Sequence, residues 1–302
     1  MILQVPEELD GQRVDKVLAV LLGVSRAEAR SLVDRGVKLN GVPATGSERV
    51  RAGSQVDTPR PLVAGGLEPE DVGFGVVHED RDLIVVDKPS GVVVHPGAGH
   101  ATGTLAAGLL FRYPGLEGVG AAGRWGLVHR LDRDTSGLLL VARNQRAFET
   151  LASALAKREI TRSYLALVRG AMDIETGTID APIGRDPAHP TRRTVLSGGK
   201  PAITHYRLIK DYAVEDLALL DVTLDTGRTH QIRVHMAAIE HPVLGDPSYG
   251  RPGPGVVAPR VFLHAHRLAL RHPGTGHRVE FESPLPDDLR RVLEQLGGPV
   301  PQ

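Results

Sequence analysis

One short segment, Gly126 to Gly137, limits what this chain can fold into more than any other part of the sequence. It reads Gly-Leu-Val-His-Arg-Leu-Asp-Arg-Asp-Thr-Ser-Gly, and apolar residues stand on both sides of its polar centre. Leu127 and Val128 before the centre, and residues 138–141 after it, have the pattern of buried strands. A rigid scaffold commonly presents its reactive groups on such a loop. We therefore expect the functional site here.

The charged residues of this loop favour a carboxylate that stays ionised. Asp132 and Asp134 stand among Arg130, Arg133 and His129. Nearby positive charge favours the charged form of a carboxyl group, and this suits a nucleophile or a base better than a proton donor. The same residues are also typical of a tight turn with surface ion pairs. The loop composition alone leaves both interpretations open.

The order of the residues favours a catalytic loop. Residues 129–138, His-Arg-Leu-Asp-Arg-Asp-Thr-Ser-Gly-Leu, closely resemble the catalytic signature of the RluA/RluD-type pseudouridine synthases. In that family the first aspartate of the motif is catalytic, and it corresponds to Asp132. The resemblance implies an RNA uridine-to-pseudouridine isomerase that needs no cofactor and no metal. Attack on C1′, attack on C6 and abstraction of a sugar proton all remain open to such a carboxylate.

Composition sets the outer limits. With 302 residues the chain is long enough for more than one domain. The absence of cysteine excludes disulfides and thiolate metal sites, and no apolar run of membrane-spanning length or export signal is present. We therefore expect a cytoplasmic protein that does not bind a membrane, and a monomer. Basic and acidic residues both number 36, so any attraction for phosphates must come from local clusters such as 124–169.

Residues 1–62 have the pattern of a small α/β domain. Helices are expected at 13–22 and 26–35, the second with Ser25 as N-cap. Arg26 and Arg30 are four residues apart and share its outer face. Asn40-Gly41 is a strong hairpin signal. The layout resembles the alpha-L RNA-binding domain, which implies that Arg26 and Arg30 contact RNA, and a generic small α/β module is the alternative.

Residues 58–75 are rich in Pro and Gly, which is typical of a linker. The linker itself is expected at 63–75, and residues 76–302 are expected to form the catalytic domain. Strands outnumber helices there and βαβ alternation is rare, which predicts an α+β fold with a mostly antiparallel mixed sheet flanked by helices. Strands are expected at 83–89, 164–168, 203–209, 217–224, 261–270 and 277–281, and helices at 104–113, 144–155, 230–239 and 287–296.

Three further motifs carry the resemblance. The segment 159–168 resembles the motif with the family's active-site tyrosine, here Tyr164; without the motif, a core tyrosine would be the simpler interpretation. The segment 224–236 resembles the motif with the family's arginine, here Arg233. It is expected to pair with Asp132, and such pairs are commonly bidentate. The segment 87–96 resembles the first motif and holds Lys88, for which an RNA contact and a scaffold turn are both open.

The resemblance also implies how RNA is bound. A base inside a helix must be flipped out before it can turn, and Arg130 is expected to fill the space that it leaves. Further RNA contacts are expected from His129, Arg133, Arg228, His230 and Lys88. Large-subunit ribosomal RNA is the expected target because of the N-terminal domain. A tRNA target, a non-catalytic RNA-binding or ribosome-assembly protein, and a glycosidase using Asp132 and Asp134 are the alternatives.

Histidine spacing does not favour a metal site. His230 and His235 are five residues apart, which separates them by about 140° around a helix. His264 and His266 would share one face of a strand, but no third ligand is near them in the sequence. We therefore expect no bound metal.

Overall fold

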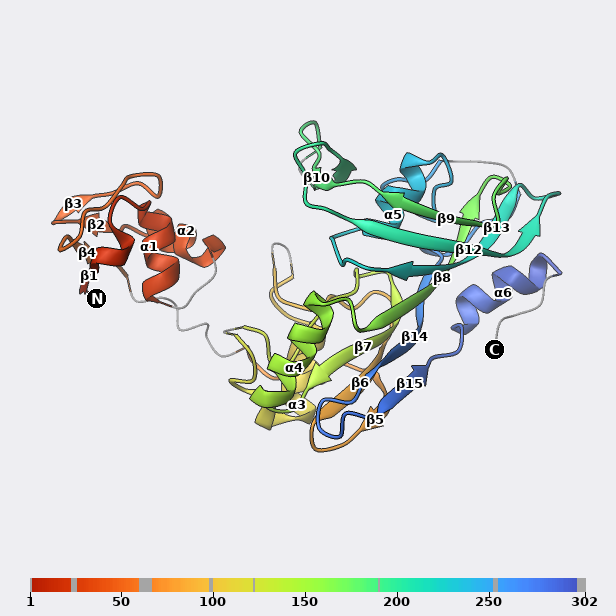
Figure 1. The fold of residues 1–302 in the computed structure, drawn as a ribbon, viewed down its shortest axis with the longest axis horizontal. Coiled ribbons are helices and arrows are strands. Elements are labelled where there is room, and N and C mark those ends of the chain that lie inside the picture. The colour runs from red at the N-terminus through yellow and green to blue at the C-terminus, as the bar shows by residue number, and fades with distance from the viewer. Residues whose placement is uncertain are drawn as a thin grey trace. The chain divides into compact units, whose positions relative to one another are not determined.

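The computed structural model describes residues 2–22, 26–59, 67–97, 100–121, 123–189, 191–251 and 255–297. They fold into two compact units (Figure 1), one within Met1–Glu68 and the other built from Pro69–Gly120 and Arg124–Gln302. No helix in these described ranges is both long and apolar enough to cross a membrane.

The N-terminal unit packs two helices against a small sheet (Figure 1). Its elements are β1 (Ile2–Gln4), the 3-10 turn η1 (Glu7–Leu9), α1 (Val14–Leu21), α2 (Arg26–Asp34), β2 (Lys38–Leu39), β3 (Val42–Pro43) and β4 (Gln55–Asp57). The strand order is β1-β4-β2-β3. Val17 and Leu18 on α1 and Leu32 on α2 are buried together, because apolar residues three and four apart face one side of a helix.

Two expectations for this unit are met and two lie outside the described residues. Asn40 and Gly41 both have positive φ, 50° and 84°, as a two-residue turn between β2 and β3 requires. Arg30 is exposed on α2. The expected N-cap Ser25 and the side chain of Arg26 lie outside the part of the chain that the structure describes.

The second unit is built on one large sheet (Figure 1). Its strands are β5 (Gly75–Glu79), β6 (Leu83–Lys88), β7 (Ser136–Ala142), β8 (Thr161–Arg169), β9 (Thr176–Asp180), β10 (Ile183–Arg185), β11 (Arg193–Val195), β12 (Ile203–Tyr212), β13 (Leu217–Leu224), β14 (Leu263–Arg271) and β15 (Arg278–Glu282). The helices are α3 (Leu105–Arg112), η2 (Pro114–Leu116), α4 (Gln145–Ala156), α5 (Gln231–Ala238) and α6 (Asp287–Gln295).

The strand order of this sheet is β5-β6-β7-β14-β8-β13-β12-β9, with β15 also paired to β14, while β10 and β11 form a separate hairpin. Only β7 and β14 run parallel among the pairs described. Every residue of β7 is buried, whereas the edge strand β5 alternates between exposed and half-buried, because a central strand is covered on both faces. The predicted α+β fold with a mostly antiparallel mixed sheet is confirmed.

The helices cover the two ends of this sheet differently. α4 packs against β7, whereas α5 contacts β12 and the short strand β11. Asn144 caps α4, since its side chain accepts a hydrogen bond from the Ala147 amide at 2.9 Å. Leu151 of α4 then packs against Leu138 and Leu140 of β7. This packing supports the strand that follows the polar loop of residues 129–135.

The structure departs from the expected elements at a few places. Leu127 and Val128 form no strand, since Leu127 makes only an isolated bridge to Val141. The reason is Gly126, which has φ 77° and would place a Cβ 2.2 Å from the Ala142 carbonyl oxygen, so the chain turns tightly against the end of β7. The short strands β5, β9, β10 and β11 were not predicted, because three to five residues give too little periodicity.

Part of the expected linker packs against the rest of the second unit. The Glu70 amide donates a hydrogen bond to the Ala107 carbonyl at 3.3 Å, and a Cβ on Gly108 would lie 2.9 Å from Val72. Gly108 thus leaves room on α3 for residues 69–74. The Pro and Gly content of this segment concealed the contact, because an extended strap on a helix has no periodic pattern.

Candidate active site

A cleft of about 520 Å³ opens in the second unit between the polar loop, β8 and the start of α5. It brings together residues that are distant in the chain, such as Asp132 and Arg233, which are 101 positions apart. Seven residues expected at the site line this cleft, namely Asp132, Tyr164, Arg233, Arg130, His129, Arg228 and His230. Its volume lies in the range of small-molecule sites and suits a single nucleotide.

Sheet topology explains why these segments meet. β7 begins at Ser136, directly after the loop that carries Asp132, and β14 lies between β7 and β8. Tyr164 of β8 pairs with Val222 of β13, and the chain leaves β13 to enter α5, where Arg233 occupies the first turn. The loop, the tyrosine and the arginine therefore come from neighbouring parts of one rigid sheet and the helix that follows it.

Arg233 is held by two carboxylates, and the stronger contact is with a residue that the sequence did not indicate. Its Nε and Nη2 donate to the two oxygens of Asp246 at 2.7 and 2.8 Å, whereas Nη1 donates to Asp132 at 3.3 Å. The expected bidentate contact thus exists, but Asp246 makes it and Asp132 makes a single bond. Burial alone would lower the pKa of Arg233, yet Asp246 and then Asp132 raise it above its ordinary value.

The Asp246 side chain is itself held in place and kept ionised by its surroundings. Its side chain is 0% exposed and also accepts hydrogen bonds from the amides of Ser248 and Tyr249. Although burial opposes ionisation, Arg233 and these amides hold the pKa of Asp246 below its usual range. A carboxylate with this many donors locks the arginine in one orientation.

Asp132 is less restricted. Its side chain is 17% exposed, and within the described residues the bond from Arg233 is its one side-chain hydrogen bond. The Thr135 amide closes the loop by donating to the Asp132 carbonyl at 3.2 Å. A fixed backbone with a free carboxylate oxygen leaves Asp132 able to meet a reacting atom in the cleft.

Tyr164 lies beside this carboxylate in the cleft. The residue is 5% exposed, and burial raises the pKa of its hydroxyl, so it stays protonated at neutral pH. Within the described part of the chain, that hydroxyl has no hydrogen-bond partner. A buried ring with an unused hydroxyl is suited to hold a planar base and to exchange a proton with it.

Tyr249 is a second aromatic residue that the sequence did not indicate. Its ring lies 5.2 Å from the Arg233 guanidinium. Its hydroxyl accepts a hydrogen bond from the Arg193 amide at 2.8 Å and bonds His230 Nδ1 at 2.9 Å. Asp246 and Tyr249 sit in Gly-Asp-Pro-Ser-Tyr-Gly, which has the pattern of an ordinary turn, so no local signal pointed to them.

His129 and His230 line the cleft as neutral side chains. Burial, followed by the charge of Arg162, lowers the pKa of His129 to about 3, and its Nε2 accepts a hydrogen bond from the Leu140 amide at 3.0 Å. Burial likewise lowers the pKa of His230. His129 therefore ties the loop to β7 and offers RNA no positive charge.

Lys88 does not contact the cleft, and the expectation that it binds RNA is wrong. The residue is 0% exposed, and its ammonium donates to the carbonyls of Pro89, Val92 and Arg133 at 2.8, 2.8 and 3.0 Å. Burial lowers the pKa of Lys88 to about 7. With all three donors used, Lys88 is the scaffold residue of the two alternatives, and it fixes the backbone one residue after Asp132.

Arg133 and Asp134 form a bidentate pair with each other, at 2.9 and 3.1 Å, and neither lines the cleft. The Asp134 carbonyl accepts hydrogen bonds from Ser90 and Arg260. A glycosidase would need a second carboxylate facing the substrate, and Asp134 does not supply one.

Two predicted cations remain available at the cleft. Arg130 is exposed and, in the described ranges, has no hydrogen-bonded or ionic partner. Arg228 is held at the rim, since its Nε donates to the Pro201 carbonyl at 3.0 Å. Arg130 thus has the freedom that an inserting residue needs, and Arg228 has a fixed position.

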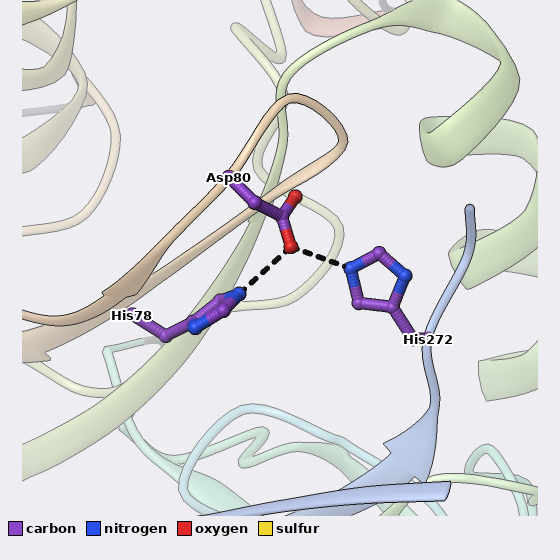
Figure 2. Close-up of side chains that lie close together, drawn as sticks. All are labelled: His78, Asp80 and His272. Carbon is purple, nitrogen blue, oxygen red and sulfur yellow. Dashed lines mark hydrogen bonds and ion pairs between the residues drawn. The ribbon is translucent and has the colours of Figure 1, made fainter. Parts of the chain in front are cut away.

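One group of described residues has metal-like spacing, away from the cleft. Ligand atoms of His78, Asp80 and His272 lie within 4.8 Å of one another, and Figure 2 shows both imidazoles bonded to one oxygen of Asp80. The Nδ1 atom of His272 accepts hydrogen bonds from the Gly274 and Thr275 amides, so in the neutral ring the proton must sit on Nε2. That nitrogen has no lone pair for a metal, and the group is a hydrogen-bonded bridge.

Comparison with known proteins places this geometry in a family. Residues 82–238 match the sequence profile described as RNA pseudouridylate synthase, and residues 12–56 match the S4 domain. An uncharacterized RNA pseudouridine synthase of Bacillus subtilis, YlyB, is 43% identical over 96% of this chain and 96% of that protein. The ribosomal large subunit pseudouridine synthase D of Escherichia coli K12 is 42% identical over 97% of this chain and 93% of that protein.

A solved structure agrees with the sequence comparisons. Human RNA pseudouridylate synthase domain containing 1 superposes with a TM-score of 0.55 at 29% identity, covering 77% of this chain and 98% of that one. Both sequence profiles, the curated relatives and this structure point the same way. The chain therefore belongs to the RNA pseudouridylate synthase family, as an enzyme with an N-terminal S4 domain.

Proposed function

We propose that this enzyme converts specific uridines of large-subunit ribosomal RNA to pseudouridine in the cytoplasm, with Asp132 as its catalytic carboxylate. The reaction breaks the bond between N1 and C1′, turns the uracil and joins C5 to C1′. The proton on C5 leaves and N1 gains one, so no oxidant or other reactant is consumed. The name of the Escherichia coli relative supports this target class.

One observation carries the assignment of Asp132. Its carboxylate shares Arg233 with Asp246, yet Asp246 takes two of the three bonds. Arg233 is therefore positioned by a partner that does not line the cleft, and Asp132 keeps an oxygen free for the nucleotide. Preorganised charge of this kind costs no rearrangement at the moment of reaction.

Tyr164 and Arg130 complete the proposed mechanism. Tyr164 holds the uracil in the cleft, and its protonated hydroxyl can relay the proton that C5 loses, accepting that proton as it gives up its own. Arg130 enters the gap that the flipped nucleotide leaves in the RNA, which offsets part of the cost of unstacking. Its exposure and its lack of a partner in the described chain support this role.

The direct test uses RNA labelled with tritium at C5 of uridine, because that hydrogen is released when C5 joins C1′. Wild-type enzyme is expected to release tritium from protein-free large-subunit ribosomal RNA, and Asp132→Asn is expected to release none above background. Bulk tRNA as a parallel substrate tests the alternative target. Release from tRNA alone would refute the ribosomal assignment, and a fully active Asp132→Asn variant would refute the assignment of the carboxylate.

A further inference from the structure

Arg162 is a buried cation that the mechanism above does not use. It lies on β8 two residues before Tyr164, and side chains two apart on a strand share one face. Both line the cleft. The residue is 6% exposed, and its one hydrogen bond within the described residues runs from Nη2 to the Leu224 carbonyl at 3.1 Å. Its Nε is fully buried and has no partner.

This situation differs from that of the other buried arginine in the cleft. Arg233 binds two carboxylates, whereas Arg162 has none within ion-pair distance in the described ranges. Removing a charge from water without a counter-ion is unfavourable, and structures normally provide a partner. Arg162 therefore costs folding free energy that its single carbonyl contact does not return.

The surrounding chain holds the guanidinium in place instead of neutralising it. Gly227, in the loop after β13, has no Cβ, and one added there would lie 3.0 Å from Nη1 of Arg162. The loop passes close to the guanidinium, and it lines the cleft as well. A cation fixed by packing, with unused donors at a substrate cleft, is arranged to receive an anion.

We propose that Arg162 binds an anionic oxygen of the target nucleotide, so that the substrate supplies the counter-ion that the protein lacks. This inference rests on the proposed function. Two groups of the nucleotide have the required chemistry. One is the phosphate of the flipped uridine; the other is the uracil ring itself, which carries the electron pair of the bond from N1 to C1′ once that bond breaks.

The test compares Arg162→Met, which keeps the length and removes the charge, with Arg162→Lys, which keeps a charge but not the planar fork. Arg207→Met is the matched control, because Arg207 is an exposed arginine paired with Asp221 outside the cleft. For each protein we would measure the urea midpoint of unfolding, the Kd for RNA at several salt concentrations and the single-turnover rate of tritium release.

We expect Arg162→Met to unfold at a midpoint equal to or above that of wild type, since an uncompensated buried charge is gone. If Arg162 binds the phosphate, the affinity of the Arg162→Met variant for RNA falls about 10- to 100-fold. The slope of its log affinity against log salt concentration then becomes shallower by about 0.7. If Arg162 binds the detached uracil, the Kd stays and the single-turnover rate falls by a similar factor. Arg162→Lys should retain part of either effect, and Arg207→Met should match wild type.

Three results would overturn the proposal. One is an Arg162→Met protein that is folded and within twofold of wild type in both Kd and rate. Another is an unfolding midpoint clearly below that of wild type, which would make Arg162 a structural residue. The third is equal loss in Arg207→Met, which would mean a non-specific effect of charge. Wild type inactive on every RNA would instead refute the proposed function, independently of Arg162.

Discussion

Two aspartates of this enzyme lie beside basic side chains at strand ends and yet have opposite characters. Asp80, in the turn between β5 and β6, uses one oxygen for the Asp82 and Leu83 amides and the other for His78 and His272 (Figure 2). Asp132 has a single side-chain partner in the described chain, Arg233. A saturated carboxylate holds structure together, whereas an unsaturated one is available for chemistry.

The same contrast separates the two buried arginines of the cleft. Arg233 is saturated by Asp246 and Asp132, and Arg162 is not. Counting partners therefore distinguishes positioning groups from groups that await the substrate, although charge and burial are similar. Substitutions at saturated positions should mainly reduce stability, and substitutions at unsaturated ones should mainly reduce activity.

The largest effect on activity is expected for Asp132→Asn. The amide keeps the shape but removes the charge, so the single-turnover rate should fall at least about 10³-fold, as when a catalytic unit is broken. The free energy of unfolding from urea titration should stay within about 0.5 kcal/mol of wild type, because only one long contact at a partly exposed side chain is weakened. A large loss of stability would place Asp132 with the saturated carboxylates.

Asp246→Asn should reduce both the stability of the protein and its single-turnover rate. It breaks a buried bidentate pair and leaves Arg233 undercompensated, which costs about 3 kcal/mol, and a misplaced Arg233 should lower the rate about 10²-fold. Denaturant unfolding and single-turnover kinetics measure the two effects. Asp288→Asn is the control, since the pair of Asp288 with Arg260 is exposed at the aspartate and is worth at most about 1 kcal/mol. Equal losses of stability and rate in both variants would contradict the proposal that Asp246 holds Arg233 in its catalytic position.

Asp80→Asn should change stability without changing the rate. The amide group would face two imidazole donors, and a poorly satisfied group of this kind costs about 1–3 kcal/mol. Tritium release under saturating RNA should remain at the wild-type value, because Asp80 does not line the cleft. A loss of activity in a fully folded variant would connect this bridge to catalysis and remove the contrast with Asp132.

The bridge also predicts a dependence of stability on pH. Burial would raise the pKa of Asp80, but the bonds from His78, the Asp82 and Leu83 amides, and His272 hold it well below its usual range. A carboxyl group with a lowered pKa in the folded state stabilises the protein above its unfolded pKa, about 3.9, and loses this contribution as the pH falls. The stability difference between wild type and Asp80→Asn should therefore shrink below about pH 4 in urea titrations.

Among the variants expected to lower the single-turnover rate, Arg130→Ala should show the smallest loss, and the size of that loss should depend on the RNA. Extruding a stacked uridine costs a few kcal/mol, and an inserted arginine offsets part of it, so the rate should fall several-fold more on a stem-loop than on a short linear RNA. Wild type must turn over both substrates for the comparison to count. The same factor on both would assign Arg130 to general binding.

The elements with clear short-range patterns were predictable from the sequence. β13 has the bounds expected from its apolar run, and α4 begins at the Asn144 cap. The motif residues Asp132, Tyr164 and Arg233 were identified by their order along the chain, and the cleft does contain all three. Such features depend on neighbours within a few residues, which the sequence displays directly.

The choice of partners was decided only by the tertiary structure. Asp246 is the bidentate partner of Arg233, and Lys88 binds three carbonyls inside the protein. Among the residues that the structure describes, no carboxylate pairs with Arg162. These outcomes depend on which side chains the sheet brings within about 3 Å, on desolvation and on the directions of donors, and no spacing along the chain encodes them. The sequence by itself determined the local elements and the family, and three-dimensional packing determined which charged groups are satisfied and which remain open for the substrate.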